Sequence, residues 1–140
     1  MRLISVFCHL FIAVLLLNPN TLRAEVPDIS STLVEGMVSI AGLKGGNISK
    51  ENLLAADSLT VQQDSIANIF IISFRLTVVY KSGSDPVELE SINGAKLTDA
   101  MRLAIQKAYN GCNVFVEFIK IRASDGTVHS HPPLSFKIVD

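Results

Sequence analysis

The chain has 140 residues, with 12 basic and 13 acidic side chains and a formal net charge of −1 at pH 7. No basic patch with interleaved aromatic residues is present in the sequence, which argues against a nucleic-acid-binding protein. Its two cysteines, Cys8 and Cys112, are too few for a scaffold held together by disulfides.

The first 24 residues have the layout of a secretory signal peptide. Met1 and Arg2 form a short basic start, the apolar run 3–17 follows, and Ala24 is a small residue suited to the position before a cleavage site. The apolar run is shorter than the roughly 20 residues that a membrane-spanning helix needs. We therefore predict a signal peptide over residues 1–24, a periplasmic or secreted location, and no stable membrane insertion after cleavage. An alternative cleavage site or an uncleaved anchor stays open.

Removal of this segment leaves residues 25–140 as a single predicted domain. The signal takes Arg2, Arg23 and Cys8 with it, so the mature chain carries 10 basic and 13 acidic residues and one cysteine. This length is sufficient for one domain with its own hydrophobic core. We predict that the remaining cysteine, Cys112, is a partly buried small residue at a junction between a helix and a strand.

Short elements are predicted in the first part of the domain. A weak strand would turn Val34, Val38 and Ile40 inward, with a bulge at Gly36. Ser49 is expected to cap a short helical turn, because its hydroxyl can accept a hydrogen bond from a free amide of the first turn. The predicted elements are, in order, a strand over 33–43, a turn over 44–47, a helical turn over 50–54 and a strand over 59–63.

Residues 66–80 form the most hydrophobic part of the mature chain. Large apolar residues, from Ile66 and Phe70 onward, occupy almost every even position, and β-branched and aromatic residues favour a strand over a helix. We expect the even positions to face the core and the odd positions to be half covered. Because this segment is long for one strand, we predict a bend or bulge near Ser73. A turn over 81–86 and a short strand over 87–92 follow.

Residues 94–126 show the clearest local pattern. Thr98 is predicted to cap an amphipathic helix of about 12 residues that ends at Asn110 and Gly111. Its buried stripe is predicted to consist of Leu97, Met101, Ala104, Ile105 and Ala108, and its solvated face of Arg102, Gln106 and Asn110. The remaining predicted elements are a strand over 114–122, a turn over 124–126, a hairpin strand over 127–131 and a terminal strand over 134–138.

These elements predict an α+β fold, namely an antiparallel β-sheet or sandwich of about six strands with one amphipathic α-helix packed on it. The apolar stripe of the helix is expected to pack on the sheet built around residues 66–80. No internal repeat and no low-complexity linker interrupts the predicted domain.

Three groups of residues are candidates for chemistry. His129 and His131 lie on one face of a strand and could begin a metal site, but zinc needs three or four ligands, and solvated edge-strand histidines are the alternative. Glu88 and Glu90 lie on one face of a short strand, which is typical of a solvent-facing strand. The segment 44–49 lacks the phosphate-loop pattern, so a turn is favoured. The sequence predicts no catalytic, cofactor-binding or metal-binding residues and no cofactor.

The ordered pattern over residues 36–139 resembles the C-terminal domain of the gliding-motility protein GldM, whose counterpart PorM serves type IX secretion. The resemblance is carried by the strand 114–119 and by Gly45, Gly46, Ile48, Ser49, Lys50, Leu53, Ser73, Phe74, Leu97, Thr98, Gly111, Asp125, Gly126, Pro133, Leu134, Phe136, Lys137 and Ile138. It implies an extracytoplasmic β-rich domain of a gram-negative bacterium of the Bacteroidota type. In full-length family members this domain ends a long dimeric periplasmic arm, which has a membrane anchor helix and contacts outer-membrane ring components.

The resemblance implies a protein-protein interaction module and not an enzyme. A stand-alone exported form is expected here, because a cleavable-looking signal stands in place of the anchor helix. The expected partners are envelope, secretion or motility proteins, with a homodimer as a further expected assembly. Two alternatives stay open: a small-ligand or metal-binding protein that uses His129 and His131, and a hydrolase that uses Cys112 or the acidic residues.

Overall fold

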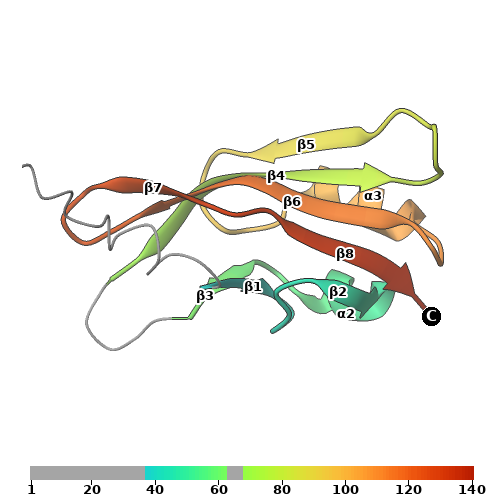
Figure 1. Ribbon diagram of the computed structural model, residues 1–140, viewed down its shortest axis with the longest axis horizontal. Coiled ribbons are helices and arrows are strands. Elements are labelled where there is room, and N and C mark those ends of the chain that lie inside the picture. The colour runs from blue at the N-terminus through green and yellow to red at the C-terminus, as the bar shows by residue number, and fades with distance from the viewer. Residues whose placement is uncertain (1–36, 63–67) are drawn as a thin grey trace, which may run out of the picture.

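The computed structural model describes residues 37–62 and 68–140 (Figure 1). The predicted signal peptide and the predicted positions Val34, Gly36 and Ile66 lie outside the described residues. Within the described part of the chain, no helix has the length and apolar character needed to cross a membrane.

The predicted α+β class is confirmed, because two short helices accompany a sheet that is mostly antiparallel. The described residues form ten elements: β1 (Val38–Ile40), β2 (Gly46–Ser49), α2 (Lys50–Ala55), β3 (Leu59–Val61), β4 (Phe70–Val79), β5 (Val87–Ser91), α3 (Asp99–Lys107), β6 (Asn113–Arg122), β7 (Val128–His131) and β8 (Leu134–Val139). Eight of these elements are strands, six of them in the main sheet, and β2 lies partly where a turn was predicted.

The main sheet has six strands in the order β2-β8-β6-β4-β5, with β7 pairing the far half of β6. All of its pairs are antiparallel except β2 with β8, which is parallel. Strands β1 and β3 form a separate antiparallel pair. In Figure 1 the long strands β4, β6 and β8 run side by side, with β5 at the upper edge.

The chain reverses earlier than the turn predicted over 44–47. Ile40 and Leu43 exchange both backbone hydrogen bonds at 2.9 Å, across a tight turn at Ala41 and Gly42. Both turn residues have positive φ, 50° and 75°, as the tightest hairpin turns require. Gly46 lies after this turn and is the first residue of β2.

The bulge predicted near Ser73 is confirmed, because the register between β4 and β6 shifts on both sides of that residue. A bulge inverts which face each later residue occupies. This inversion makes the expectation for Phe70 wrong: Phe70 is exposed, whereas its neighbour Ile71 is buried. Beyond the bulge, the even positions Phe74, Leu76 and Val78 face the core as predicted.

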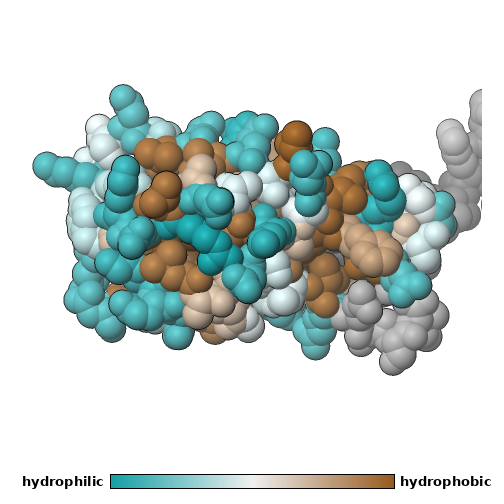
Figure 2. All heavy atoms as spheres, turned by 180° about the vertical axis from the view of Figure 1, so that it is seen from behind, coloured by the Kyte–Doolittle hydropathy of each residue, from teal (hydrophilic) through white to brown (hydrophobic). Residues whose placement is uncertain are grey.

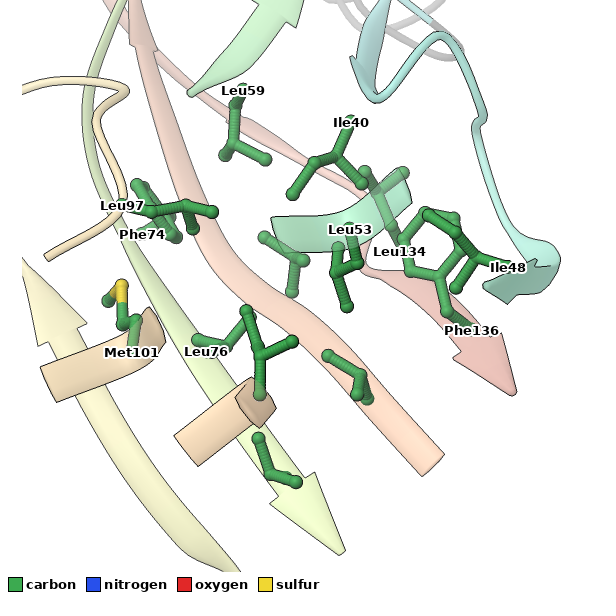
Figure 3. Packing of buried hydrophobic residues seen from close by; sticks show 14 of the residues in the cluster. Ile40, Ile48, Leu53, Leu59, Phe74, Leu76, Leu97, Met101, Leu134 and Phe136 are labelled. Atoms are coloured by element: carbon green, nitrogen blue, oxygen red, sulfur yellow. The ribbon is translucent and has the colours of Figure 1, made fainter. Parts of the chain in front are cut away.

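The core lies between the inner face of the main sheet and a layer formed by β1, β3, α2 and α3. Figure 3 shows Ile40 and Leu53 from this layer close to Leu134 and Phe136 of β8. All four side chains are buried. Full burial of each such side chain stabilises the fold by about 1.5–3 kcal/mol.

Helix α3 begins at Asp99 and is capped by Thr98, whose hydroxyl accepts the Met101 N–H at 3.3 Å, as predicted. It ends at Lys107 and is shorter than predicted, because Ala108 already has an extended backbone. The Ala108 carbonyl accepts a hydrogen bond from Lys50 Nζ at 3.2 Å. The predicted apolar stripe is confirmed in full, since Leu97, Met101, Ala104, Ile105 and Ala108 are all buried.

Two side-chain contacts fix the position of α3. The Tyr80 hydroxyl donates to the Ala104 carbonyl at 2.9 Å, and burial raises the pKa of this phenol. Arg102 donates to the Leu54 carbonyl at 3.0 Å and to Asp57 Oδ1 at 2.6 Å. The expectation of a fully solvated helix face is therefore wrong for Arg102, which links α3 to the end of α2.

Residues on opposite sides of α3 provide a matched test of its packing. Met101 is fully buried, whereas Leu103 is 57% exposed. Met101→Ala should lower the free energy of unfolding by about 2–5 kcal/mol, since it leaves a cavity in the core. Leu103→Ala should change it by no more than about 0.5 kcal/mol. Urea denaturation measures both values, and equal losses would contradict the orientation of the helix.

Candidate functional site

The exposed ring of Phe118 lies at an irregular point of β6. Its φ is 50° and its side chain is 65% exposed. Val116 is buried before it and Ile119 after it, so Phe118 is the extra residue of a bulge that faces the one near Ser73. A residue with a Cβ is strained at this φ, by about 1–2 kcal/mol.

The guanidinium of Arg75 covers the Phe118 ring, with its carbon 4.6 Å from the ring centroid. The same guanidinium pairs with Glu90 Oε1 at 2.7 Å and with Glu88 Oε2 at 3.1 Å. The hydrogen bond with Glu90 is the main cause that raises the pKa of Arg75, and the charges of Glu88 and Glu117 act in the same direction. Arg75 thus stays charged and joins β5 to the bulge of β6.

The prediction that Glu88 and Glu90 lie on one exposed face of a strand is confirmed. The cross-strand register places Glu90 opposite Arg75 and Glu88 opposite Thr77. Sequence reasoning missed Arg75 as their common partner, because that contact depends on the register between β4 and β5. The alternation of apolar and acidic residues in β5 indicated only that the two carboxylates share a face.

A depression of about 340 Å³ lies beside these charges, between the end of β5 and the bulge of β6. Its lining consists of Ser73, Phe74, Arg75, Glu90, Ser91, Ile92, Phe118 and Lys120. Ile92 and Phe118 are exposed apolar residues of this lining, and Arg75, Glu90 and Lys120 are its charged residues. Ser91 Oγ lies 3.3 Å from the Gly94 carbonyl and 3.2 Å from the Lys96 carbonyl, and its one proton is shared between these two acceptors. The hydroxyl thus holds the loop after β5.

Two further hollows share only Ser91 with this depression. One, of about 310 Å³, is lined by Lys50, Glu51, Ala108, Tyr109, Asn110, Ile138, Val139 and Asp140. The other, of about 350 Å³, is lined by Ser91, Asn93, Lys96, Leu97, Thr98 and Asp99. Neither lining contains a histidine or a cysteine.

The two histidines of β7 have different environments, and the alternative of solvated edge-strand histidines is wrong for His131. The His131 ring is buried, and its Nε2 lies 3.3 Å from the Val38 N–H, from which it accepts. Its Nδ1 lies 2.6 Å from the Pro132 carbonyl and therefore carries the proton. His129 Nε2 lies 2.9 Å from the Thr127 hydroxyl. Among residues 37–62 and 68–140, no group of three or more His, Cys, Asp or Glu side chains is arranged to hold a metal ion.

Cys112 lies between α3 and β6, as predicted, and is fully buried. Its thiol donates to the Tyr80 carbonyl at 3.3 Å and accepts the Tyr109 N–H at 3.3 Å. The segment 44–49, predicted as a turn, instead contains β2, and Lys50 after it donates to the Ala108 carbonyl. The contacts of the Cys112 thiol and of Lys50 Nζ thus each join neighbouring elements of the fold.

Exposed apolar side chains occur at several separate places. The large ones are Leu43, Phe70, Ile92, Leu103, Tyr109, Phe118 and Val128. Figure 2 shows the reverse side of the molecule, where brown areas alternate with teal ones. Apolar surface alone therefore does not single out a docking face on this side. Phe118 and Ile92 line one depression together, and Ile92 directly follows the edge strand β5.

Comparison with known proteins finds no family model that matches this sequence and no matching curated protein sequence. The likeness to the C-terminal domain of GldM therefore stays an expectation from the residues themselves.

Substitution of Phe118 tests whether the bulge holds a strained backbone. Valine normally favours a strand over glycine, by about 1 kcal/mol. At positive φ the order should reverse, because a β-branched residue is strongly disfavoured there and glycine is not. Phe118→Gly should therefore be more stable than Phe118→Val by about 1 kcal/mol in urea denaturation. A more stable valine variant would contradict the conformation of the bulge.

The histidines provide a second matched pair within one strand. His131→Ala should lower the free energy of unfolding by about 2–3 kcal/mol, because it leaves a cavity and removes the partner of a buried N–H. His129→Ala removes a more accessible hydrogen bond and should cost about 0.5–1 kcal/mol. Thermal and urea denaturation measure both. A larger loss for His129 would contradict the different environments of the two rings.

Proposed function

We propose that this chain is an exported, non-enzymatic protein-protein interaction module of the kind that the C-terminal domain of GldM represents. The observation that carries the proposal is the edge strand β5, which pairs with β4 and with no other described strand. Such an edge presents unpaired N–H and C=O groups that a strand of another protein can use. The depression between Ile92 and Phe118 adds an apolar contact beside this edge.

The placement of the reactive side chains supports binding over hydrolysis. A thiol nucleophile needs a base within hydrogen-bond reach and access to substrate. Cys112 is instead buried, and its thiol donates to a backbone carbonyl. Glu88 and Glu90 are engaged with Arg75 across the sheet surface.

The second candidate is a small-ligand or metal-binding protein that uses His129 and His131, and the geometry favours it less. Both ring nitrogens of His131 contact backbone groups inside the fold. A metal would have to displace the Val38 N–H or the Pro132 carbonyl before it could bind there. Zinc titration by calorimetry, with the His129→Ala/His131→Ala variant as control, measures any such binding.

Export and partner capture test the leading proposal directly. A C-terminally tagged chain in its native host should appear in the periplasmic or extracellular fraction without residues 1–24, as mass spectrometry of its N-terminus can determine. After crosslinking in intact cells, it should copurify with envelope, secretion or motility proteins. A control with arginines at Leu15 and Leu16 should stay unprocessed, because charges interrupt the apolar run. Unprocessed wild-type protein in the cytoplasm, or capture of no envelope protein, would contradict the proposal.

A further inference from the structure

We infer that the open edge of β5 is a docking strand for an extended segment of a partner protein in which basic and apolar residues alternate. The inference deepens the proposed function and rests on it, because it states which surface is used and what chemistry the partner brings.

The side chains of β5 define what an added strand would meet. Val87 and Leu89 are half-buried on the core side of the sheet, whereas Glu88 and Glu90 are exposed on the outer side. Residues directly opposite each other on neighbouring strands point to the same face. A strand added beside β5 would therefore place its apolar residues next to Val87 and Leu89, and its alternate residues next to the carboxylates.

The charge on the outer side favours a basic partner. Arg75 contacts one oxygen of each carboxylate, Glu88 Oε2 and Glu90 Oε1, and does not contact the other oxygen of either group. Glu117 also acts on Arg75, and Lys120 lines the depression together with Arg75 and Glu90. The three carboxylates and two cations of this surface leave one net negative charge beside the edge. Lysine or arginine side chains on an incoming strand would face this charge at the usual spacing between strands, about 4.8 Å.

The same charges disfavour two other occupants. If a second copy of β5 were added with the apolar faces on the same side, Glu88 and Glu90 would lie against carboxylates of the copy, which destabilises the pair. The N-terminal residues 25–36 of this chain contain Glu25, Asp28 and Glu35 and no lysine or arginine. They therefore lack the complementary charge that a segment of another protein can bring.

The depression at the end of β5 provides a second contact for the same partner. Ile92 follows β5 directly, and Phe118 lines the same depression. The Phe118 ring is held in the open at a φ that disfavours residues with a side chain. Backbone strain of this kind is typical of functional positions. A large apolar side chain at the end of the added strand can occupy this depression and contact Ile92 and Phe118.

Two synthetic peptides test the charge requirement. Both are capped at their ends and long enough to pair with all of β5; one alternates valine with lysine and the other valine with glutamate. In NMR titrations of labelled residues 25–140, the lysine peptide should bind at least about tenfold more tightly, a factor that corresponds to 1.4 kcal/mol. Its binding should shift the β5 amides and slow their hydrogen exchange. Equal affinities, or shifts confined to β2 or to β1 and β3, would overturn the inference.

Matched variants of the protein test whether Glu88 and Glu90 contact the peptide. Glu88→Gln/Glu90→Gln keeps the shape of both side chains and should weaken the lysine peptide about tenfold. Glu51→Gln, at an exposed acidic residue of α2, should leave the affinity unchanged. Thermal melts by circular dichroism verify that each variant is folded. Undiminished binding to the double variant would overturn the assignment of these carboxylates.

The apolar contact has its own test. A tryptophan added to the end of the lysine peptide that reaches Ile92 should increase its affinity for the wild-type protein. The gain should be lost in Phe118→Gly, which removes the ring and relieves the backbone at the bulge. A gain of equal size in the variant would overturn the role of the depression.

Capture from the native host separates this inference from the function on which it rests. Equal recovery of an envelope partner by the wild type and by Glu88→Gln/Glu90→Gln would leave the interaction module in place and overturn the edge assignment. Recovery of no partner by either protein would overturn the module itself.

Discussion

The pairing of β4 with β6 is the constraint on which the rest of the structure depends. These two strands lie in the middle of the main sheet, and each is paired with another strand on its outer side. Because α3 and β5 lie between them in the sequence, this pairing closes a long loop, which costs conformational entropy. Buried residues of both strands form one side of the core, and the remaining elements pack against them.

The irregularity of this pair has a direct consequence for the surface. Extra residues near Ser73 in β4 and at Phe118 in β6 invert the inward and outward faces of both strands together. The core therefore stays continuous, with Ile71 and Ile119 buried where a regular register would expose them. On the opposite face, the inversion leaves Phe118 exposed and brings it under Arg75. The paired bulges thus keep the core continuous and also leave the Phe118 ring exposed.

Local signals were sufficient to predict much of this fold. The caps at Ser49 and Thr98 depend on neighbouring amides, and the alternation of β8 depends on a single buried face. The turns over 81–86 and 124–126, the hairpin of β7 and the apolar stripe of α3 were predictable for the same reason. Chain-order patterns of this kind require no knowledge of which distant segments meet.

Several features that the sequence did not predict depend on distant partners. β2 has a sequence typical of a turn and becomes a strand because β8 pairs with it along its length. His131 is buried because Val38, far away in the chain, supplies the N–H that its ring accepts. Arg102 was placed on the solvated face by helical periodicity, but Leu54 and Asp57 meet it there. Only the assembled fold determines these contacts.

Arg75 is the clearest case of a residue whose role depends on its neighbours from both sides. From the sequence alone, a basic residue in the middle of a hydrophobic strand does not indicate which residues it contacts. In the sheet it lies between the carboxylates of β5 and the ring of β6, and it couples the edge strand to the bulge. Natural sheets commonly place charges at their edges to prevent association with further copies. The carboxylates of Glu88 and Glu90 meet that requirement on β5, because a second copy of this strand would bring like charges opposite them.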